Sequence, residues 1–192
     1  YKLAFYFQSG NESLFFLNYL KKSNSILAGN YDPVLSRWNA TTGKKELTYG
    51  SHNERLAALQ LSKDEKYILT ASRDGVVRKM EAATGKIVFH KKLFNNQWAT
   101  SVDFSANDSL FVVAGGRASS VVFNAEGGDE TTLSDASGSY ESFSKFSPNG
   151  KYVLHDDNFT VQLVRLSDNK RLLTIDSISM FTEQRFSPDG AY

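Results

Sequence analysis

The residues of this chain that could support chemistry are few and fall in two short clusters. His155-Asp156-Asp157-Asn158 gathers nitrogen and oxygen donors that could hold a hard cation. The cluster lacks the ligand spacing of a calcium loop, so we expect a polar turn there. Gly115-Gly116-Arg117 is rich in glycine, as phosphate-binding loops are. Because it falls between two expected strands and opens no helix, a hairpin turn is the better interpretation.

Motifs of nucleophilic, phosphoryl-transfer and metal-dependent enzymes are absent from the sequence. It has no Gly-x-Ser-x-Gly elbow, no phosphate loop with Gly-Lys-Ser or Gly-Lys-Thr, and no paired-histidine zinc motif. It has no cysteine, so disulfides, thiolate catalysis and thiolate metal sites are excluded. We therefore predict no catalytic residue, no metal site and no cofactor. A relay assembled from distant parts of the chain stays open.

Charge and hydropathy exclude some classes of partner. The 22 Lys and Arg residues nearly cancel the 21 Asp and Glu residues, which leaves a formal charge of +1. Such a balance creates no protein-wide field that would gather nucleic acid or an anionic membrane surface. No apolar run approaches the roughly 20 residues that span a bilayer, so we expect no membrane insertion. The compartment stays open, with a lean towards the cytoplasm.

A repeat of about 42 residues organises the whole sequence. Each unit has a short apolar strand that runs into a polar turn and then a second apolar strand. The anchor residues of this pattern, spaced by 41, 43, 42 and 40 residues, are Leu20, Leu61, Phe104, Phe146 and Phe186. Tight turns keep the same interval, at Thr42-Gly43-Lys44, Thr84-Gly85-Lys86, Gly127-Gly128-Asp129 and Asp168-Asn169-Lys170. The Gly or Asn in each turn supplies the positive φ that such turns require.

Each unit contains four short segments with the alternation or the apolar run of a β-strand. In the second unit the predicted strands cover residues 56–61, 67–71, 76–81 and 87–90. An aromatic content of 13% suits a pleated, half-buried surface, and no segment has a sustained helical spacing. A four-stranded meander repeated every ~40–45 residues is typical of propeller blades. We therefore predict an all-β fold, a β-propeller of four-stranded antiparallel blades.

The chain holds about four and a half of these predicted blades. The units cover about residues 14–49, 56–90, 99–133 and 141–175, with partial blades at 1–8 and 181–192. A propeller left open exposes strand edges and the apolar faces between blades. We therefore expect this segment of 1–192 to belong to a propeller of seven blades or more, completed by the same chain or by another. Self-association of an open segment is the alternative.

The second unit resembles the WD-repeat family of β-propellers. Gly50-Ser51-His52 is similar to the family's Gly-His element, and a strand-turn-strand core follows it. The resemblance implies a hydrogen-bonded chain of Asp74, His52 and Thr70, with Met80 in place of the family's Trp. Such a chain is physically reasonable, because a buried polar group left without its partner costs about 1–3 kcal/mol.

The other units match the family's pattern less well. The first keeps the turn Asp32 and the Trp38 of the motif, with Asn39 in place of its closing Asp. At the Trp-Asp position the third unit has Phe123-Asn124 and the fourth has Val164-Arg165. These departures describe a degenerate set of repeats. Quinoprotein, TolB-like and peptidase-associated propellers share the Phe-Ser-Pro-Asp-Gly turns, so these families stay open as alternatives.

The resemblance also implies where partners bind. In propellers of this family, partners dock on the face formed by the fourth-to-first and the second-to-third strand connections. Trp, Tyr and Arg are the types enriched at interface hot spots. The candidates on that face are Trp98, Tyr140, Arg73, Arg55, Tyr31 and Arg117. The alternative for Trp98 is that it caps the core of its blade, because an apolar strand follows it directly.

These observations favour a non-catalytic scaffold for protein–protein interaction, a propeller platform within a larger protein or assembly. The expected partners are proteins, together with the rest of the propeller. We expect neither nucleic acid nor a membrane as partner. The alternatives are the propeller domain of an enzyme, of the peptidase-associated or quinoprotein-like kind, and a carbohydrate-binding propeller.

Overall fold

The computed structural model describes residues 14–30, 33–50, 52–95, 97–115, 118–133, 142–156, 160–176 and 186–187. Within these ranges the regular structure is entirely β, with sixteen strands in four antiparallel sheets of four. Each sheet is built from strands that are consecutive in sequence, as a meander requires. The predicted all-β fold of four-stranded blades is confirmed.

The four sheets are numbered here as blades in chain order. Blade 1 consists of β1 (Leu14–Leu20), β2 (Ser25–Asn30), β3 (Leu35–Asn39) and β4 (Lys45–Thr48). Blade 2 consists of β5 (Leu56–Leu61), β6 (Tyr67–Ser72), β7 (Val76–Glu81) and β8 (Ile87–Lys92). Blade 3 consists of β9 (Ala99–Phe104), β10 (Leu110–Gly115), β11 (Ala118–Asn124) and β12 (Thr131–Thr132). Blade 4 consists of β13 (Phe143–Phe146), β14 (Tyr152–Asp156), β15 (Thr160–Arg165) and β16 (Lys170–Asp176).

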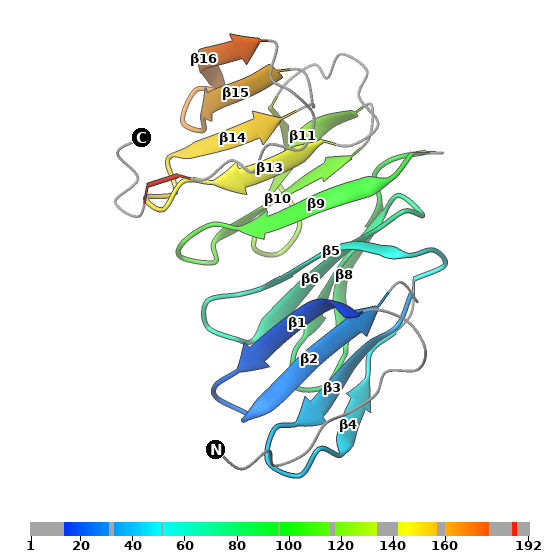
Figure 1. Ribbon diagram of the computed structural model, residues 1–192. Coiled ribbons are helices and arrows are strands. Elements are labelled where there is room, and N and C mark those ends of the chain that lie inside the picture. The colour runs from blue at the N-terminus through cyan, green and yellow to red at the C-terminus, as the bar shows by residue number, and fades with distance from the viewer. Residues whose placement is uncertain are drawn as a thin grey trace.

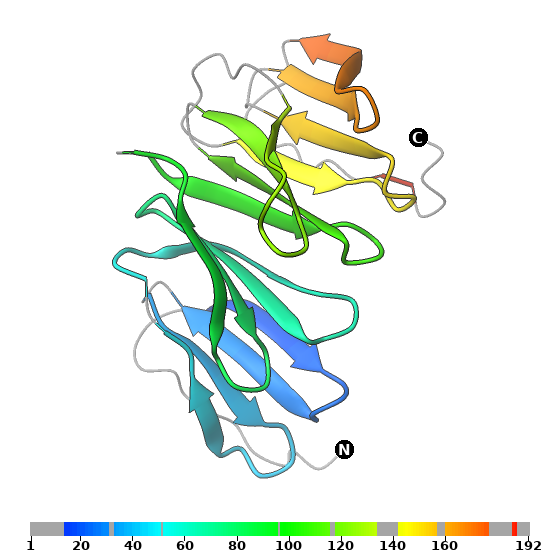
Figure 2. The same ribbon diagram turned by 180° about the vertical axis from the view of Figure 1, so that it is seen from behind.

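The blades stack face to face in the order of the sequence, from blade 1 in blue to blade 4 in yellow and orange (Figure 1). The view from behind shows the same order (Figure 2). Strand β9 lies beside both β5 and β13, so the first strands of the blades form one side of the array. The connections between strands lie along two opposite sides of the stack (Figure 1). One of these sides carries the β6–β7 and β8–β9 connections of the predicted binding face.

Three apolar seams hold the blades together, because each sheet must bury both of its faces. The seam between blades 1 and 2 contains Leu20, Leu27, Leu35, Tyr49, Leu56, Ile68, Met80 and Ala82. The seam between blades 2 and 3 is richest in aromatic side chains, and the rings of Phe111 and Phe123 stack there with their centroids 5.0 Å apart. The seam between blades 3 and 4 contains Val112, Val122, Leu133, Phe146, Val153 and Val164. The high aromatic content of the sequence is thus used between blades.

Backbone conformation explains the second repeat marker. Gly43, Gly85, Gly127 and Asn169 lie in the turns that lead to the fourth strand of each blade, and their φ angles are 68°, 75°, 88° and 52°. These values lie in the left-handed region that Gly adopts without cost and that Asn tolerates. The prediction that these residues supply a positive φ is confirmed.

The anchor predicted for the first unit is wrong by one residue. Tyr19 is the cross-strand partner of Ile26, as Leu61 is the partner of Ile68 in blade 2. Leu20 points to the opposite face and packs into the seam with blade 2. A shift of one residue in a strand turns the side chain to the other face of the sheet. The true spacing between the first two anchors is therefore 42 residues.

The polar turn expected at His155-Asp156 is also not found. Both residues belong to β14, and their exposed fractions are 0% and 6%. Buried polar side chains persist where neighbours provide hydrogen bonds, and His155 contacts the hydroxyl groups of Ser120 and Ser144. The rest of the predicted cluster and the partial blades at 1–8 and 181–192 lie outside the described residues, apart from Phe186 and Ser187. In the part that is described, no helix has the length and hydropathy to cross a membrane.

Candidate functional site

Three of the six predicted binding residues come together at one end of blade 2. The main-chain N–H of Arg73 donates to the carbonyl oxygen of Arg55 at 3.0 Å. The guanidinium carbon of Arg73 lies 4.1 Å from the centroid of the Trp98 ring, which is a close cation–π contact. Arg55 is exposed, and Arg73 and Trp98 are half-buried. A cationic and aromatic surface therefore spans the β6–β7 turn and the β8–β9 connection.

The position of Arg73 is set by the tight turn that joins β6 to β7. The carboxylate of Asp74 accepts the main-chain N–H groups of Asn53 at 3.0 Å and Val76 at 2.9 Å. The hydroxyl of Ser72 donates to the carbonyl oxygen of Glu54 at 3.0 Å. Burial alone would raise the pKa of Asp74, but the N–H donors of Asn53 and Val76, together with His52 and Ser72, hold the pKa below its usual value. Asp74 is therefore ionised, and its carboxylate joins the turn to the β4–β5 connection.

His52 supports this turn from beneath. Its Nε2 lies 2.8 Å from the Thr70 hydroxyl, and its Nδ1 lies 3.4 Å from the Asp74 carboxylate. Burial lowers the pKa of His52 to about 4, with the charge of Arg78 acting in the same direction and Asp74 against it. The imidazole is therefore neutral at pH 7. Asp74 favours the tautomer with the proton on Nδ1, which lets Nε2 accept the hydroxyl hydrogen of Thr70. At 3.4 Å, Nδ1 makes an electrostatic contact with the carboxylate and no hydrogen bond.

The geometry brings together the Asp74, His52 and Thr70 that the resemblance implies. Met80, at the position of the family's Trp, is 1% exposed and belongs to the apolar seam with blade 1. It contributes apolar packing and no hydrogen-bond donor. The polar chain in blade 2 consequently ends at Thr70.

Trp98 is held by close backbone packing around the β8–β9 connection. Gly75 has a φ of 77°, and a Cβ atom there would lie 2.1 Å from the carbonyl oxygen of Phe94. A Cβ atom on Gly115 would lie 2.4 Å from the Phe94 ring and 2.6 Å from the carbonyl oxygen of Trp98. Only glycine fits at either position, because real Cβ contacts are not this short. Two glycines from neighbouring blades thus fix the segment that carries Trp98.

The remaining predicted site residues are not brought to this surface by the described part of the structure. Tyr31, Asp32, Arg117 and Tyr140 lie outside the described residues. Trp38 is described, lies half-buried in β3, and has the Lys45 ammonium 5.2 Å from the centroid of its ring.

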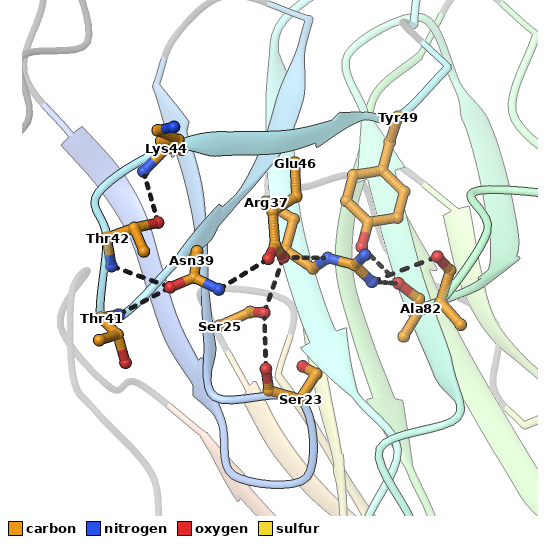
Figure 3. A network of polar contacts seen from close by, with 11 residues as sticks. Ser23, Ser25, Arg37, Asn39, Thr41, Thr42, Lys44, Glu46, Tyr49 and Ala82 are labelled. Atoms are coloured by element: carbon orange, nitrogen blue, oxygen red, sulfur yellow. Dashed lines mark hydrogen bonds and ion pairs between the residues drawn. The ribbon is translucent and has the colours of Figure 1, made fainter.

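A polar network between blades 1 and 2 was not found by sequence reasoning (Figure 3). The Arg37 guanidinium and the Tyr49 hydroxyl both donate to the carbonyl oxygen of Ala82, at 2.7 and 2.6 Å. The Glu46 carboxylate lies 3.2 Å from Arg37 Nε and accepts the Asn39 amide at 3.0 Å. These contacts join the third and fourth strands of blade 1 to a turn of blade 2, and so stabilise the seam.

Lys79 makes the corresponding contact from blade 2 to blade 3. It is 4% exposed, its ammonium donates to the carbonyl oxygen of Ala125, and the nitrogen lies 4.2 Å from the centroid of the Tyr67 ring. Burial lowers the pKa of Lys79. One feature of the sequence indicates these contacts between blades. A cationic residue directly precedes the Trp position, Arg37 before Trp38 and Lys79 before Met80.

A buried Ser–His contact lies between blades 3 and 4. It is relevant because the sequence alone did not exclude a catalytic relay of residues from distant parts of the chain. The Ser120 hydroxyl lies 2.6 Å from His155 Nδ1, and both residues are 0% exposed. A dissolved substrate has no access to such a pair, so it serves to satisfy buried polar groups. His90 is exposed in β8, and no group of His, Asp and Glu in the described ranges has the arrangement of a metal site.

Comparisons with known proteins agree with this geometry. Residues 43–79, from the β3–β4 turn to β7, match the family model of the WD40 repeat, described as WD domain, G-beta repeat. No curated protein matches the chain. The chain is similar in structure to the β-propeller domain of Cps50 (Swd1) from Myceliophteria thermophila, with a TM-score of 0.76 and 13% sequence identity. The match covers 94% of this chain and 60% of that one, and at this identity it shows the fold alone. Residues 43–79 therefore match one WD40 repeat, and the chain as a whole has the fold of a β-propeller.

Proposed function

We propose that this protein is a non-catalytic platform that binds a protein partner through the surface of Arg55, Arg73 and Trp98. A WD-repeat propeller is in general a scaffold for protein interactions. The observation that supports this particular surface is the cation–π contact of Arg73 with Trp98, in which the guanidinium carbon lies 4.1 Å from the ring centroid. Arg and Trp are the residue types that most often dominate binding energy at interfaces.

The rigidity of the surface favours binding. Asp74 and Ser72 attach the Arg73 turn to its neighbours, and Gly75 and Gly115 fix the segment that carries Trp98. Immobilising a flexible side chain on association costs about 0.5–1.5 kcal/mol. Residues that are already held before the partner arrives avoid much of this cost.

The rest of the propeller is a second proposed partner, within the same chain or in another. Leu17 and Tyr19 on blade 1 are 62% and 53% exposed, although their counterparts Leu59 and Leu61 pack in the seam between blades 1 and 2. Phe143 of blade 4 is 41% exposed. Large apolar side chains gathered on a sheet face favour a covering layer. We expect Tyr19→Asp to lower the unfolding midpoint of the full-length protein, whereas Thr131→Asp on exposed β12 leaves it unchanged.

Site-specific photo-crosslinking in the full-length protein tests the proposed platform. A photoreactive amino acid at Gln97, beside Trp98, is expected to capture the partner. The same group at Lys86, in the β7–β8 turn at the opposite end of blade 2, is expected not to. Trp98→Ala and Arg73→Ala should abolish partner capture and leave the far-UV spectrum unchanged. Capture from Lys86, or unaltered binding by both variants, would exclude this face.

A further inference from the structure

We propose that two copies of this chain associate through strand β16 (Lys170–Asp176), which pairs antiparallel with the same strand of the second copy. Among the described residues β16 pairs with β15 alone, so it forms the outer edge of blade 4 (Figure 1). All seven of its residues are exposed. The unpaired main-chain groups of such an edge are a template for another strand. The proposed platform lies on blade 2, so this inference goes beyond the proposed function.

The outermost strands of the other blades are poorly suited to such pairing. β12 has two residues and β4 has four, which leaves little main chain to pair. β8 has six residues, but it ends in His90, Lys91 and Lys92 and contains no acidic residue. Lysines on an edge strand oppose pairing with a like strand. β4, β8 and β16 each have a bulge against the third strand of their blade, so the length and the charges of β16 are what set it apart.

The centre of β16 is apolar and lies on the surface. Leu172, Leu173 and Ile175 are 42%, 49% and 47% exposed. A further blade would pack on the face of this sheet, as blades 2 and 3 pack on one another, and would leave the main-chain edge of β16 open. Completion of the propeller therefore does not remove this edge.

The order of residues in β16 is complementary to itself. Hydrogen-bonded and non-hydrogen-bonded pairs alternate in an antiparallel ladder, so a two-fold axis passes through one residue pair and not between two pairs. With Leu173 opposite its own copy, all seven residues have a partner, and Lys170 faces Asp176 of the second copy at each end. Neither of these charged residues forms an ion pair within the described ranges of its own chain. Because opposite charges directly across a ladder stabilise it, the charge pattern fits a second copy of this chain.

Sedimentation velocity of the full-length protein tests the association. One pair of seven-residue strands is a small interface, so the dimer should depend on concentration. We expect a monomer at roughly 1 µM and a rising share of dimer towards roughly 100 µM, as for a weak complex. A monomer throughout this range would overturn the inference.

Charge reversal tests the antiparallel register. Lys170→Asp and Asp176→Lys each place like charges at both ends of the ladder, and each should weaken association at least about tenfold. An equimolar mixture of these two variants has opposite charges at both ends, so it should associate as a heterodimer. Lys92→Asp, at the exposed end of β8, is the matched control and should leave association unchanged. Undiminished association of both single variants, or no recovery in their mixture, counts against the inference.

A cysteine at the two-fold axis gives a test that needs no charge. The 192 residues contain no cysteine. Residues directly opposite each other in an antiparallel ladder have Cα atoms ~4.5–5.5 Å apart, a separation that a disulfide spans. Leu173→Cys should therefore form a covalent dimer on mild oxidation, whereas Val88→Cys, at a β8 residue that is 41% exposed, should not. Equal amounts of covalent dimer from the two variants, or none from Leu173→Cys, would overturn the inference even if a charge variant fails to fold.

Discussion

The Asp108 carboxylate of blade 3 accepts the main-chain N–H of Lys63 in blade 2 at 2.9 Å. Its second oxygen accepts the N–H of Asp64 at 3.0 Å. One seam earlier, Glu65 of blade 2 accepts the N–H groups of Lys21 and Lys22 in blade 1, at 3.2 and 2.9 Å. Both acidic residues have a positive φ, 57° for Glu65 and 58° for Asp108. The two carboxylates thus bind the preceding blade in the same way, from equivalent turns.

Gly150 occupies the same turn position in blade 4, with a φ of 68° and open space around a Cβ atom. Gly150→Asp is therefore expected to direct a carboxylate to the N–H groups of Ala106 and Asn107 in blade 3. Gly150→Ala is the control, because it places a non-glycine residue at the same positive φ but adds no carboxylate. We expect Gly150→Asp to be more stable than Gly150→Ala by about 1 kcal/mol in urea unfolding, the usual net value of an added hydrogen bond. Equal stability of the two variants would show that no contact forms across this seam.

Thr70→Val tests the hydrogen bond that Thr70 makes with His52 in the interior of blade 2. Valine has nearly the same shape as threonine but lacks the hydroxyl that lies 2.8 Å from His52 Nε2, so Nε2 loses its hydrogen-bond partner. We expect the free energy of unfolding to fall by about 1–3 kcal/mol, the cost of an unsatisfied buried group. Thr132→Val on exposed β12 is the control and should change it by less than ~0.5 kcal/mol. A similar small effect at both positions would mean that the contact with His52 contributes little.

Local patterns in the sequence predicted most of the strands. In blade 2 the predicted strands 56–61 and 76–81 coincide with β5 and β7. The predicted strands 67–71 and 87–90 were short by one and two residues, because β6 ends at Ser72 and β8 ends at Lys92. Alternation and turn residues are short-range signals, and a meander needs only short-range signals to be read from a sequence.

Contacts between blades could not be read in the same way. The cation–π contact of Arg73 with Trp98 joins residues that no repeat spacing connects. The cation before the Trp position marks Arg37 but does not show that its hydrogen bond goes to Ala82. Both depend on how the sheets stack, which the order of the residues does not show. The one-residue error at Leu20 has a local cause. Its neighbours are apolar too, so the sequence fits either Tyr19 or Leu20 as the anchor, and only the pairing of Tyr19 with Ile26 shows which is correct.

Two buried titratable groups are expected to give opposite pH dependences of stability. The pKa of His52 falls from 6.5 to about 4, so the unfolded chain binds a proton more readily between these values. The stability that neutral His52 contributes is therefore fully present above pH 6.5 and is lost as the pH falls towards 4. Burial raises the pKa of Asp103 from 3.8 to about 6, against the N–H of Phe146 and the charge of Lys145. Stability from Asp103 is therefore present below pH 3.8 and lost as the pH rises to 6.

Asp103→Asn should separate the two groups. The amide oxygen of Asn can still accept the N–H of Phe146, which lies 2.9 Å from the Asp103 carboxylate, and it carries no charge to desolvate. We expect the variant to be more stable than the original protein by about 2 kcal/mol at pH 7 and to lose that advantage near pH 4. Its stability should then rise with pH between 4 and 6.5, as His52 alone requires. The check is urea unfolding across this range, with Asp176→Asn on exposed β16 as control. An advantage that persists unchanged at pH 4 would mean that Asp103 is not the titrating group.

The position of the segment that carries Trp98 depends on the glycine at residue 75. A pair of alanine variants can separate the cost of a positive φ from the cost of a clash with the Phe94 carbonyl oxygen. Gly75→Ala and Gly150→Ala impose similar backbone costs, because φ is 77° and 68°. At Gly75 the added methyl would also lie 2.1 Å from the Phe94 carbonyl oxygen, whereas at Gly150 nothing lies within 4 Å. We expect Gly150→Ala to cost about 1 kcal/mol and Gly75→Ala at least about 2 kcal/mol more, since the β8–β9 connection must move. Only Gly75→Ala should also reduce crosslinking from Gln97, because it displaces the backbone that holds Trp98 against Arg73. Equal losses of stability in the two variants, with crosslinking intact, would show that the connection adjusts without cost and that Trp98 is not held by this packing.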